Sequence, residues 1–499
     1  MALAGCNLPP VSLNGSAGQP GIPSFLLTAL PTIPSSSAIL IPTAGVAGGE
    51  AEPTPVVNTT LQPPYLYTTQ AGDSLASLAA RFGVKPADIS AAKPLPTEGL
   101  INPGLILTIP HVLGETSPAT RILPDSEVVF SPTTLDFNIK DYVKDAGGYL
   151  SSYKDYVNNA TRSGAEIIQI IAQENSINPR LLLALLQYQS NWVLGQPGNL
   201  AQSEYPLGYL DVNYHGLYGQ LTWAVRQLSI GYYGWRAGTL TKVTFPDRST
   251  LRLSPEPSAG TVAAQYFFSK LYNRREWSSV LYSEEGFSAL FEKMFDNPWV
   301  RTQPFEPFFP PNLVQPVLEL PFFYDRTWSY TGGPHAAWGT DSPQAAVDFA
   351  PGSTESGCIV SQAWVLASAP GLVIRSENGI VMLDLDGDGY EQTGWVLLYL
   401  HIASDKRVAL GARLNRDDLI GHPSCEGGLA TGTHVHMTRK YNGEWILADG
   451  PMPFTLSGWR AHAGSKEYEG TFTKNGKTVT ACTCGSNETN IIRTRLAGP

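Results

Sequence analysis

Helix-forming and strand-forming segments occupy different parts of this chain of 499 residues, and this order limits the folds open to it. The long segments with helical apolar spacing lie in the middle, at residues 164–192, 217–228 and 261–271. Short apolar segments typical of strands follow, for example at 346–350 and 395–400. A chain of this length exceeds what one hydrophobic core holds. We therefore expect a multidomain α+β protein whose helices and sheets form separate domains.

Charge and hydropathy exclude several classes of protein. Asp and Glu number 43 against 33 Lys and Arg, which gives a formal net charge of −10. A broad basic surface is therefore missing, and we expect no nucleic-acid partner. Only 15% of the residues are charged, which argues against a disordered polyelectrolyte. No apolar run approaches the roughly 20 residues that cross a bilayer. We expect a soluble monomer rich in loops.

The first 63 residues have the composition of an extended tether. Residues 7–63 are rich in Pro, Ser, Thr, Gly and Ala and contain no Lys or Arg. Such a segment buries too little apolar surface to offset its ordering entropy. Cys6 follows Leu-Ala-Gly, which resembles the lipobox of bacterial lipoproteins, although the hydrophobic stretch of that family is missing before it. Two explanations stay open: a late start codon with a membrane-tethering lipid on Cys6, or a chance match.

Four of the five cysteines lie in the C-terminal third of the chain. Cys358, Cys425, Cys482 and Cys484 form an even set, consistent with two disulfides and an oxidising, extracytoplasmic compartment. Buried free thiols are the alternative. A bridge between Cys482 and Cys484 would strain disulfide geometry, so we expect each of them to pair with Cys358 or Cys425.

Residues 64–111 have the pattern of a small βααβ module. A turn is expected at Gly72, after a first strand, and apolar residues at helical spacing follow in residues 75–82. A second helix is expected over residues 86–92, and the last strand over 105–109.

This module resembles a LysM module. The resemblance implies that it binds the N-acetylglucosamine chains of peptidoglycan or chitin in a shallow groove. The turn at Gly72, Asp73 and Ser74 would lie beside that groove and contact the glycan. The sequence departs from the family at Lys93-Pro94, where Asn is frequent.

The helical region resembles the lysozyme-like core of lytic transglycosylases, with residues 242–255 as a hairpin insert. In that family a buried helix ends in Glu-Ser, and the Glu is the general acid. Gln189 stands at the matching position, followed by Ser190. An amide cannot protonate a glycosidic oxygen, so we expect a degenerate domain that holds glycan or acts as a spacer.

The sharpest chemical signal is a set of histidines and one aspartate at strand-like positions. His335 follows Gly-Gly-Pro, Asp348 lies in an apolar strand, and His401 ends another. His434 and His436 are two residues apart on a strand, so they face the same side. Catalytic zinc takes three nitrogen or oxygen ligands and keeps one position open for water.

This pattern resembles the lysostaphin-like (LytM) zinc endopeptidases, and its long gap between His335 and Asp348 resembles the LasA and beta-lytic branch. The resemblance implies a mainly antiparallel β domain. It also implies that His335, Asp348 and His436 bind Zn²⁺, whereas His434 and His401 act on the water and the oxyanion.

The segment from Asp384 to Asp388 has the spacing of an EF-hand loop, but Trp395 stands where the bidentate Glu would be. A polar hairpin turn is expected between the two neighbouring strands in any case. Calcium binding by this loop stays open.

Taken together, the sequence predicts an exported bacterial cell-wall hydrolase. It would be secreted or lipid-anchored at the envelope, with peptidoglycan as its partner and Zn²⁺ as its cofactor. It would be a zinc endopeptidase that cuts stem or cross-bridge peptides, with Gly-rich bonds preferred. The alternatives are a non-catalytic peptidoglycan-binding adaptor that activates another hydrolase, and a weak lytic transglycosylase. The expected parts are a tether (1–63), a LysM module (64–111), a linker (112–138), a lysozyme-like domain (139–305) and a peptidase domain (306–499).

Overall fold

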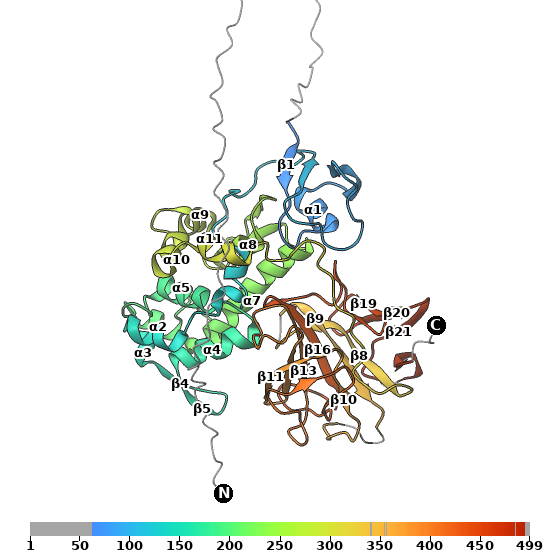
Figure 1. Ribbon diagram of the computed structural model, residues 1–499. Helices are drawn as coiled ribbons and strands as arrows, with labels where there is room; N and C mark the ends of the chain where they lie inside the picture. The colour runs from blue at the N-terminus through green and yellow to red at the C-terminus, as the bar shows by residue number, and fades with distance from the viewer. Residues whose placement is uncertain (1–61, 340–341, 354, 356, 485, 495–499) are drawn as a thin grey trace, which may run out of the picture. The chain divides into compact units, whose positions relative to one another are not determined.

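The computed structural model describes residues 62–339, 342–353, 355, 357–484 and 486–494 (Figure 1). Cys6 and nearly all of the predicted tether lie outside the described residues. From residue 62 onward the described chain belongs to one compact unit. Among the helices of this part, none is long and apolar enough to span a membrane.

The N-terminal module is a small sheet packed on one helix. Its elements are β1 (Tyr65–Thr68), α1 (Leu75–Phe82), β2 (Ser90–Ala91) and β3 (Ile106–Ile109), of which Figure 1 labels β1 and α1. The strands have the order β1-β3-β2. Ser74 caps α1 through a reciprocal pair of hydrogen bonds with Ser77. Leu78 and Phe82 of α1 are fully buried against this sheet.

The predicted second helix of this module is wrong. Residues Pro86–Asp88 form a single 3₁₀ turn, and Ile89 already has extended backbone angles. Ser90 and Ala91 then pair with Thr108 and Leu107 of β3. Pairing with β3 satisfies backbone groups that so short a helix would leave unpaired at both of its ends.

The helical domain is built around two helices joined by a tight turn. α4 (Gly164–Asn175) and α5 (Pro179–Ser190) lie in its core, and Leu181 to Leu186 of α5 are fully buried. Pro179 starts α5, and the Asn178 side chain caps the helix by accepting a hydrogen bond from the Arg180 amide. The predicted hairpin is present as β6 (Lys242–Thr244) and β7 (Thr250–Arg252).

The remaining elements of this domain cover that core. They are α2 (Ile139–Ala146), α3 (Tyr149–Ser152), β4 (Lys154–Val157), β5 (Ala160–Ser163), α6 (Leu200–Glu204), α7 (Gly216–Ala237), α8 (Ala259–Ser269), α9 (Arg274–Tyr282), α10 (Phe287–Phe295) and α11 (Pro298–Thr302). The domain begins earlier than predicted. Residues 122–130 include buried apolar side chains of the same cluster, so the expected linker is shorter than 112–138.

The C-terminal domain is an antiparallel sheet with smaller sheets beside it, as predicted (Figure 1). The nine-stranded sheet has the order β14-β11-β12-β13-β16-β9-β8-β22, with β17 added on β16. Its strands are β8 (Thr327–Ala336), β9 (Gln344–Pro351), β11 (Gly371–Glu377), β12 (Ile380–Asp384), β13 (Trp395–Leu400), β14 (Arg413–Leu414), β16 (Val435–Tyr441), β17 (Glu444–Trp445) and β22 (Asn490–Ile492). The smaller sheets pair β10 (Val365–Leu366) with β15 (Leu419–Gly421), and join β18 (Thr455–Leu456), β19 (Trp459–Ala463), β20 (Gly470–Lys474) and β21 (Lys477–Thr480).

The two faces of the large sheet pack against different partners. Leu383 and Leu397 belong to the domain's own apolar core. Met382 and Leu398, which alternate with them, belong to the apolar cluster of the helical domain. Both faces of β12 and β13 are therefore covered, which explains their nearly continuous apolar sequence.

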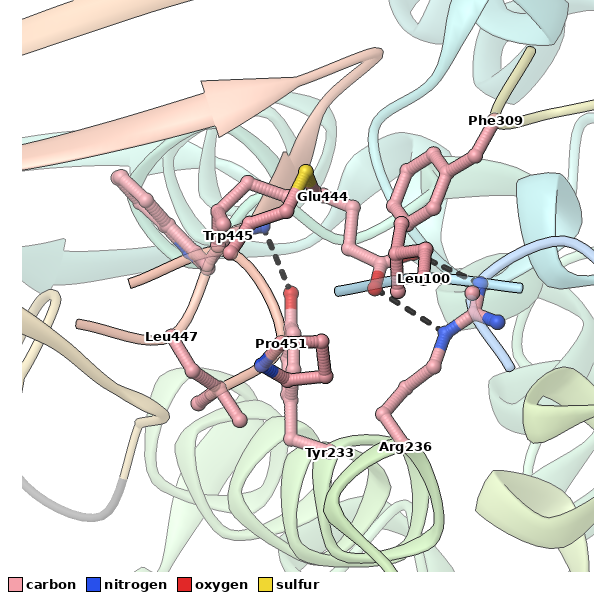
Figure 2. A pocket seen from close by; sticks show the side chains of 11 residues that line it. Leu100, Tyr233, Arg236, Phe309, Glu444, Trp445, Leu447 and Pro451 are labelled. Atoms are coloured by element: carbon pink, nitrogen blue, oxygen red, sulfur yellow. Dashed lines mark hydrogen bonds and ion pairs between the residues drawn. The ribbon is translucent and has the colours of Figure 1, made fainter. Parts of the chain in front are cut away.

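A buried arginine joins the helical domain to its neighbours. Arg236 of α7 forms two hydrogen bonds with the Glu444 carboxylate, at 2.9 and 3.1 Å (Figure 2). The same guanidinium lies 2.9 Å from Asp125 and donates to the carbonyl of Ala71 in the N-terminal module. Gly72 permits this approach, because a Cβ there would lie 2.1 Å from the guanidinium. One cation thus ties three parts of the chain together.

All four predicted disulfide cysteines are bonded, but the expected pairing is wrong. Cys358 pairs with Cys425, and Cys482 pairs with Cys484. The Cα atoms are 5.6 and 5.2 Å apart, both within the usual range. Cys482 and Cys484 follow β21, whereas the other two lie on loops that meet beside β16, and this placement decides the pairing.

We predict that Arg236→Met lowers the unfolding free energy by about 3–5 kcal/mol, because it leaves Glu444 and Asp125 buried without their cation. Thermal and urea unfolding of the full chain measure the change. The matched control is Arg460→Met, which removes an exposed ion pair with Glu98 and should cost less than about 1 kcal/mol. Equal losses in the two variants would contradict this role of Arg236.

Candidate metal centre

Strand register brings three predicted ligands together from three neighbouring strands. His436 of β16 stands directly opposite Asp348 of β9. β8 pairs with the other side of β9, where Gly332 is opposite Asp348 and His335 is opposite Ala346. Residues that face each other across antiparallel strands project from the same face of the sheet. The register therefore directs the side chains of Asp348 and His436 toward one point.

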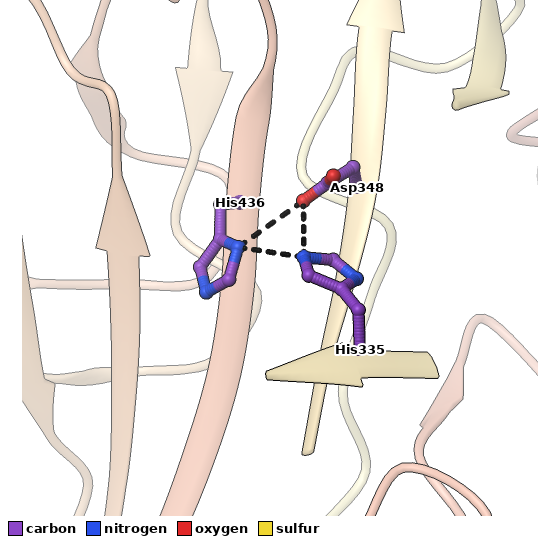
Figure 3. Close-up of side chains that lie close together, drawn as sticks. All are labelled: His335, Asp348 and His436. Carbon is purple, nitrogen blue, oxygen red and sulfur yellow. Dashed lines mark hydrogen bonds and ion pairs between the residues drawn. The ribbon is translucent and has the colours of Figure 1, made fainter. Parts of the chain in front are cut away.

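The ligand atoms lie within contact distance of one another (Figure 3). His335 Nε2 is 3.0 Å from His436 Nδ1. The Asp348 Oδ1 atom is 3.3 Å from the first of these nitrogens and 3.2 Å from the second. All three residues are buried, with at most 6% of each exposed.

The hydrogen bonds on the far side of each ring fit a bound cation. His335 Nδ1 donates to the carbonyl of Gly333 at 2.7 Å, and His436 Nε2 donates to that of Ala337 at 3.1 Å. In neutral imidazoles these bonds leave His335 Nε2 and His436 Nδ1, the nitrogens that face the cluster, without a hydrogen and with a free lone pair. Asp348 Oδ1 is buried and has no hydrogen-bond donor. With both rings neutral, three acceptor atoms thus converge, and this donor set suits Zn²⁺.

The charges of the cluster also favour a cation. Burial opposes ionisation of Asp348, but His335 and His434 hold the pKa of this carboxyl well below its usual range. Although burial opposes the effect, the same carboxylate raises the pKa of His335. Burial lowers the pKa of His436, which keeps that ring neutral as a ligand must be.

Gly332 makes room for the Asp348 carboxylate. A Cβ at Gly332 would lie 2.5 Å from Asp348 Oδ2. Any larger residue in β8 at this point would therefore push the carboxylate out of the cluster. Gly332, three residues before His335, thus has a steric role that the sequence pattern did not reveal.

The two other predicted histidines lie beside the cluster on loop segments. His401 follows β13, and its ring centroid is 4.5 Å from that of His434, which precedes β16. His434 Nε2 is 3.7 Å from Asp348 Oδ2. Each ring donates its Nδ1 hydrogen to a carbonyl, of Glu426 at 2.9 Å for His401 and of Gly432 at 2.8 Å for His434. Both Nε2 atoms are therefore left as proton acceptors.

His401 has an unusual backbone conformation. Its φ is +67°, in the left-handed region that non-glycine residues rarely adopt. Burial and the neighbouring His434 lower its pKa to about 4. The imidazole of His401 is therefore neutral near pH 7.

Tyr468 is a residue of this site that the sequence analysis missed. Its ring stacks on His335, with the centroids 4.1 Å apart and the planes inclined by 21°. About half of the side chain is exposed, so it forms part of the rim of the metal centre. It lies on the turn between β19 and β20 rather than in a strand next to the ligands, and no spacing pattern marks it.

The residues predicted to bind glycan lie elsewhere and are buried. Asp73 is fully buried, bonded to Arg81 and Tyr67, and Ser74 is occupied in the α1 cap. The Gly72 turn packs against Arg236. The burial of these three residues contradicts the prediction that they contact sugar. Glycan binding by the module as a whole stays a prediction.

The structure also places Gln189 and the acidic loop from Asp384 to Asp388, the two other features that the sequence analysis singled out. Gln189 lies in the last turn of α5, and its Oε1 accepts a hydrogen bond from the Tyr272 hydroxyl at 2.7 Å. Asp384 accepts hydrogen bonds from three backbone amides of its own loop, so it stabilises the turn between β12 and β13. The carboxylate of Asp384 lies close to the carboxylates of Asp386 and Asp388.

Comparison with known proteins connects both large domains to one group of proteases. A family model described as the LasA N-terminal domain matches residues 121–307. Beta-lytic metalloendopeptidase from Achromobacter lyticus is 28% identical over 178 residues, which are 32% of this chain and 43% of that protein. Protease LasA from Pseudomonas aeruginosa is 24% identical over 352 residues, or 66% of this chain and 78% of that protein. A solved structure of the M23 metalloprotease pseudoalterin from the deep sea is 25% identical and covers 34% of this chain and 96% of its own, with a TM-score of 0.29.

These relatives support the LasA and beta-lytic part of the predicted resemblance, and one of them is named a metalloendopeptidase, which is the enzyme class that the sequence predicts. The match spans less than half the length of the Achromobacter protein. The LysM and lysozyme-like resemblances stay predictions.

We predict that Gly332→Ala weakens metal binding by about 10–100-fold, as is typical when the support of a metal ligand is removed. Competition with a chromophoric chelator measures the affinity. Gly352→Ala is the matched control, because a Cβ there meets nothing within 4 Å. Unchanged affinity in Gly332→Ala would show that Asp348 does not need this space.

We predict that the chain releases no anhydro-sugar products from purified glycan strands, because Gln189 has no acidic proton. The assay is mass spectrometry of digests made with His436→Ala, in which the metal centre is disabled. Detection of such products would contradict the prediction and require an acid other than residue 189.

Proposed function

We propose that this protein is a zinc-dependent endopeptidase that cuts the stem or cross-bridge peptides of bacterial peptidoglycan, with Gly-rich bonds preferred. The observation that carries the proposal is the convergence of His335, Asp348 and His436 with two further histidines beside them. The similarity to a beta-lytic metalloendopeptidase and to protease LasA supports the reaction class.

His335, Asp348 and His436 would hold the zinc ion through two imidazole nitrogens and one carboxylate oxygen. When bound, Zn²⁺ supplies Lewis acidity, lowers the pKa of water toward about 7 and polarises a peptide carbonyl. The Gly333 and Ala337 carbonyls keep both rings in the tautomer that this role requires.

His434 and His401 would move protons. Each presents an unprotonated Nε2, and His434 lies close to Asp348. His434 would accept a proton from the attacking water as general base. A neutral His401 with its hydrogen on Nδ1 cannot donate from Nε2, so it would stabilise an oxyanion only after taking up a proton there.

The surroundings proposed for this activity are the bacterial envelope. Two disulfides suit an oxidising, extracytoplasmic compartment. The N-terminal module would hold glycan strands through surfaces other than the Gly72 turn, and a lipid on Cys6 would tether the chain. A non-catalytic adaptor would have no need for five metal-centre residues in this arrangement, and Gln189 counts against a transglycosylase.

We predict that His436→Ala abolishes both bound zinc and cleavage of an oligoglycine peptide, whereas His401→Ala keeps zinc and loses about 10²–10⁴-fold in kcat, the usual value of a proton-transfer group. Metal analysis and steady-state kinetics on each purified variant give the two readouts.

His462→Ala is the control, since this histidine of β19 bonds Thr473 away from the cluster. It should keep both zinc and rate. If His401→Ala lost zinc while His335→Ala retained it, the assignment of ligands and proton carriers would be wrong. Absence of peptide cleavage by the zinc-loaded wild type would overturn the proposed function.

A further inference from the structure

The Cys358–Cys425 disulfide joins the two loop segments that hold His401 and His434. The bonded residues are 67 positions apart in sequence, with 5.6 Å between their Cα atoms. The immediate neighbours of Cys425 contact His401, and those of Cys358 contact Thr433, the residue before His434. The disulfide therefore fixes how these two segments lie against each other.

On one side of the bond, the residues flanking Cys425 hold His401. The Ser424 amide and hydroxyl both donate to the His401 carbonyl, at 2.7 and 3.0 Å. The Glu426 carbonyl accepts the Nδ1 hydrogen of the ring at 2.9 Å. Ser424 also forms an antiparallel bridge with His434. The backbone strain at His401 needs such support, because its left-handed conformation is costly for a residue with a Cβ.

On the other side, the residues flanking Cys358 hold Thr433, which lies between Gly432 and His434. The Gly357 carbonyl accepts a hydrogen bond from the Thr433 amide at 3.1 Å. The Ile359 amide donates to the Thr433 hydroxyl at 3.0 Å. Gly432 in turn supplies the carbonyl that fixes the tautomer of His434. A movement of the Cys358 segment would thus reach His434 through one residue.

The zinc ligands are held in a different way. Asp348 and His436 lie in paired central strands of the large sheet, and His335 lies in the strand beside them. Ladder hydrogen bonds keep them in place without help from the Cys358 loop. The disulfide therefore acts on the proton carriers and not on the metal ligands.

We propose that the Cys358–Cys425 disulfide is a positioning device for His401 and His434, required for the rate of peptide cleavage but not for metal binding or substrate affinity. This inference rests on the proposed function. Part of Cys358 is solvent-exposed, so this disulfide does not lie in the hydrophobic core.

The test compares two double variants of the full chain. Cys358→Ser/Cys425→Ser should lose about 10–100-fold in kcat on an oligoglycine peptide, since misplacement by about 1 Å costs up to about 10²-fold. Its zinc content should stay at the wild-type level, and its KM should change by less than about threefold, because neither the ligands nor the sheet is altered. Cys482→Ser/Cys484→Ser, the matched control, should keep kcat within about twofold of the wild type, because that bond follows β21 and joins neither of the two loop segments that hold His401 and His434.

Two results would overturn the inference: an unchanged kcat in Cys358→Ser/Cys425→Ser, or a loss of kcat that only follows a loss of zinc. If this variant fails to fold, Thr433→Val decides, because it removes the hydroxyl contacts and leaves the disulfide intact. It should show the same fall in kcat with zinc retained, and a wild-type rate would contradict the inference. Failure of the proposed function is recognised separately, by an inactive but zinc-loaded wild type.

Discussion

The pairing of β16 with β9 is the constraint on which the metal centre depends. It sets His436 directly across from Asp348, and β8 then adds His335 from the other side. A shift of β16 by one residue against β9 would turn His436 to the opposite face of the sheet, away from Asp348. The apolar residues of these strands prevent the shift, because Val347 and Met437 must stay in the core of the C-terminal domain. The burial of ordinary side chains thus fixes the geometry of the polar ones.

The protein also separates two tasks between two kinds of structure. The three candidate ligands lie in strands, where hydrogen-bonded ladders hold them rigidly. The two candidate proton carriers lie at strand ends and depend on loop contacts with Glu426 and Gly432. Zinc needs fixed distances, whereas proton transfer needs a ring that can accept and release a hydrogen in turn. A disulfide beside the loops compensates for the ladder bonds that the loops do not have.

The three parts of the described chain are not independent units on flexible linkers. Arg236 bonds Glu444, Asp125 and the Ala71 carbonyl at once, and apolar residues of the large sheet pack into the helical cluster. His436 is opposite Leu400, a member of that cluster, so the metal centre lies on the face that the helical domain partly covers. The helical domain therefore forms part of the surroundings of the candidate metal centre, whatever its own binding properties.

The sequence by itself determined the long helices, the central strands and the types of the candidate ligands. Apolar spacing located the long helices and the central strands, and the i, i+2 spacing of His434 and His436 put both rings on one side, since local periodicity decides which side of a strand a residue faces. Tertiary structure alone decided the rest. The disulfide pairing, the burial of Gly72 and Asp73, and the stacking of Tyr468 on His335 all depend on segments far apart in the chain. Such contacts are set by how whole domains pack, and no local pattern of residues records which surfaces will meet.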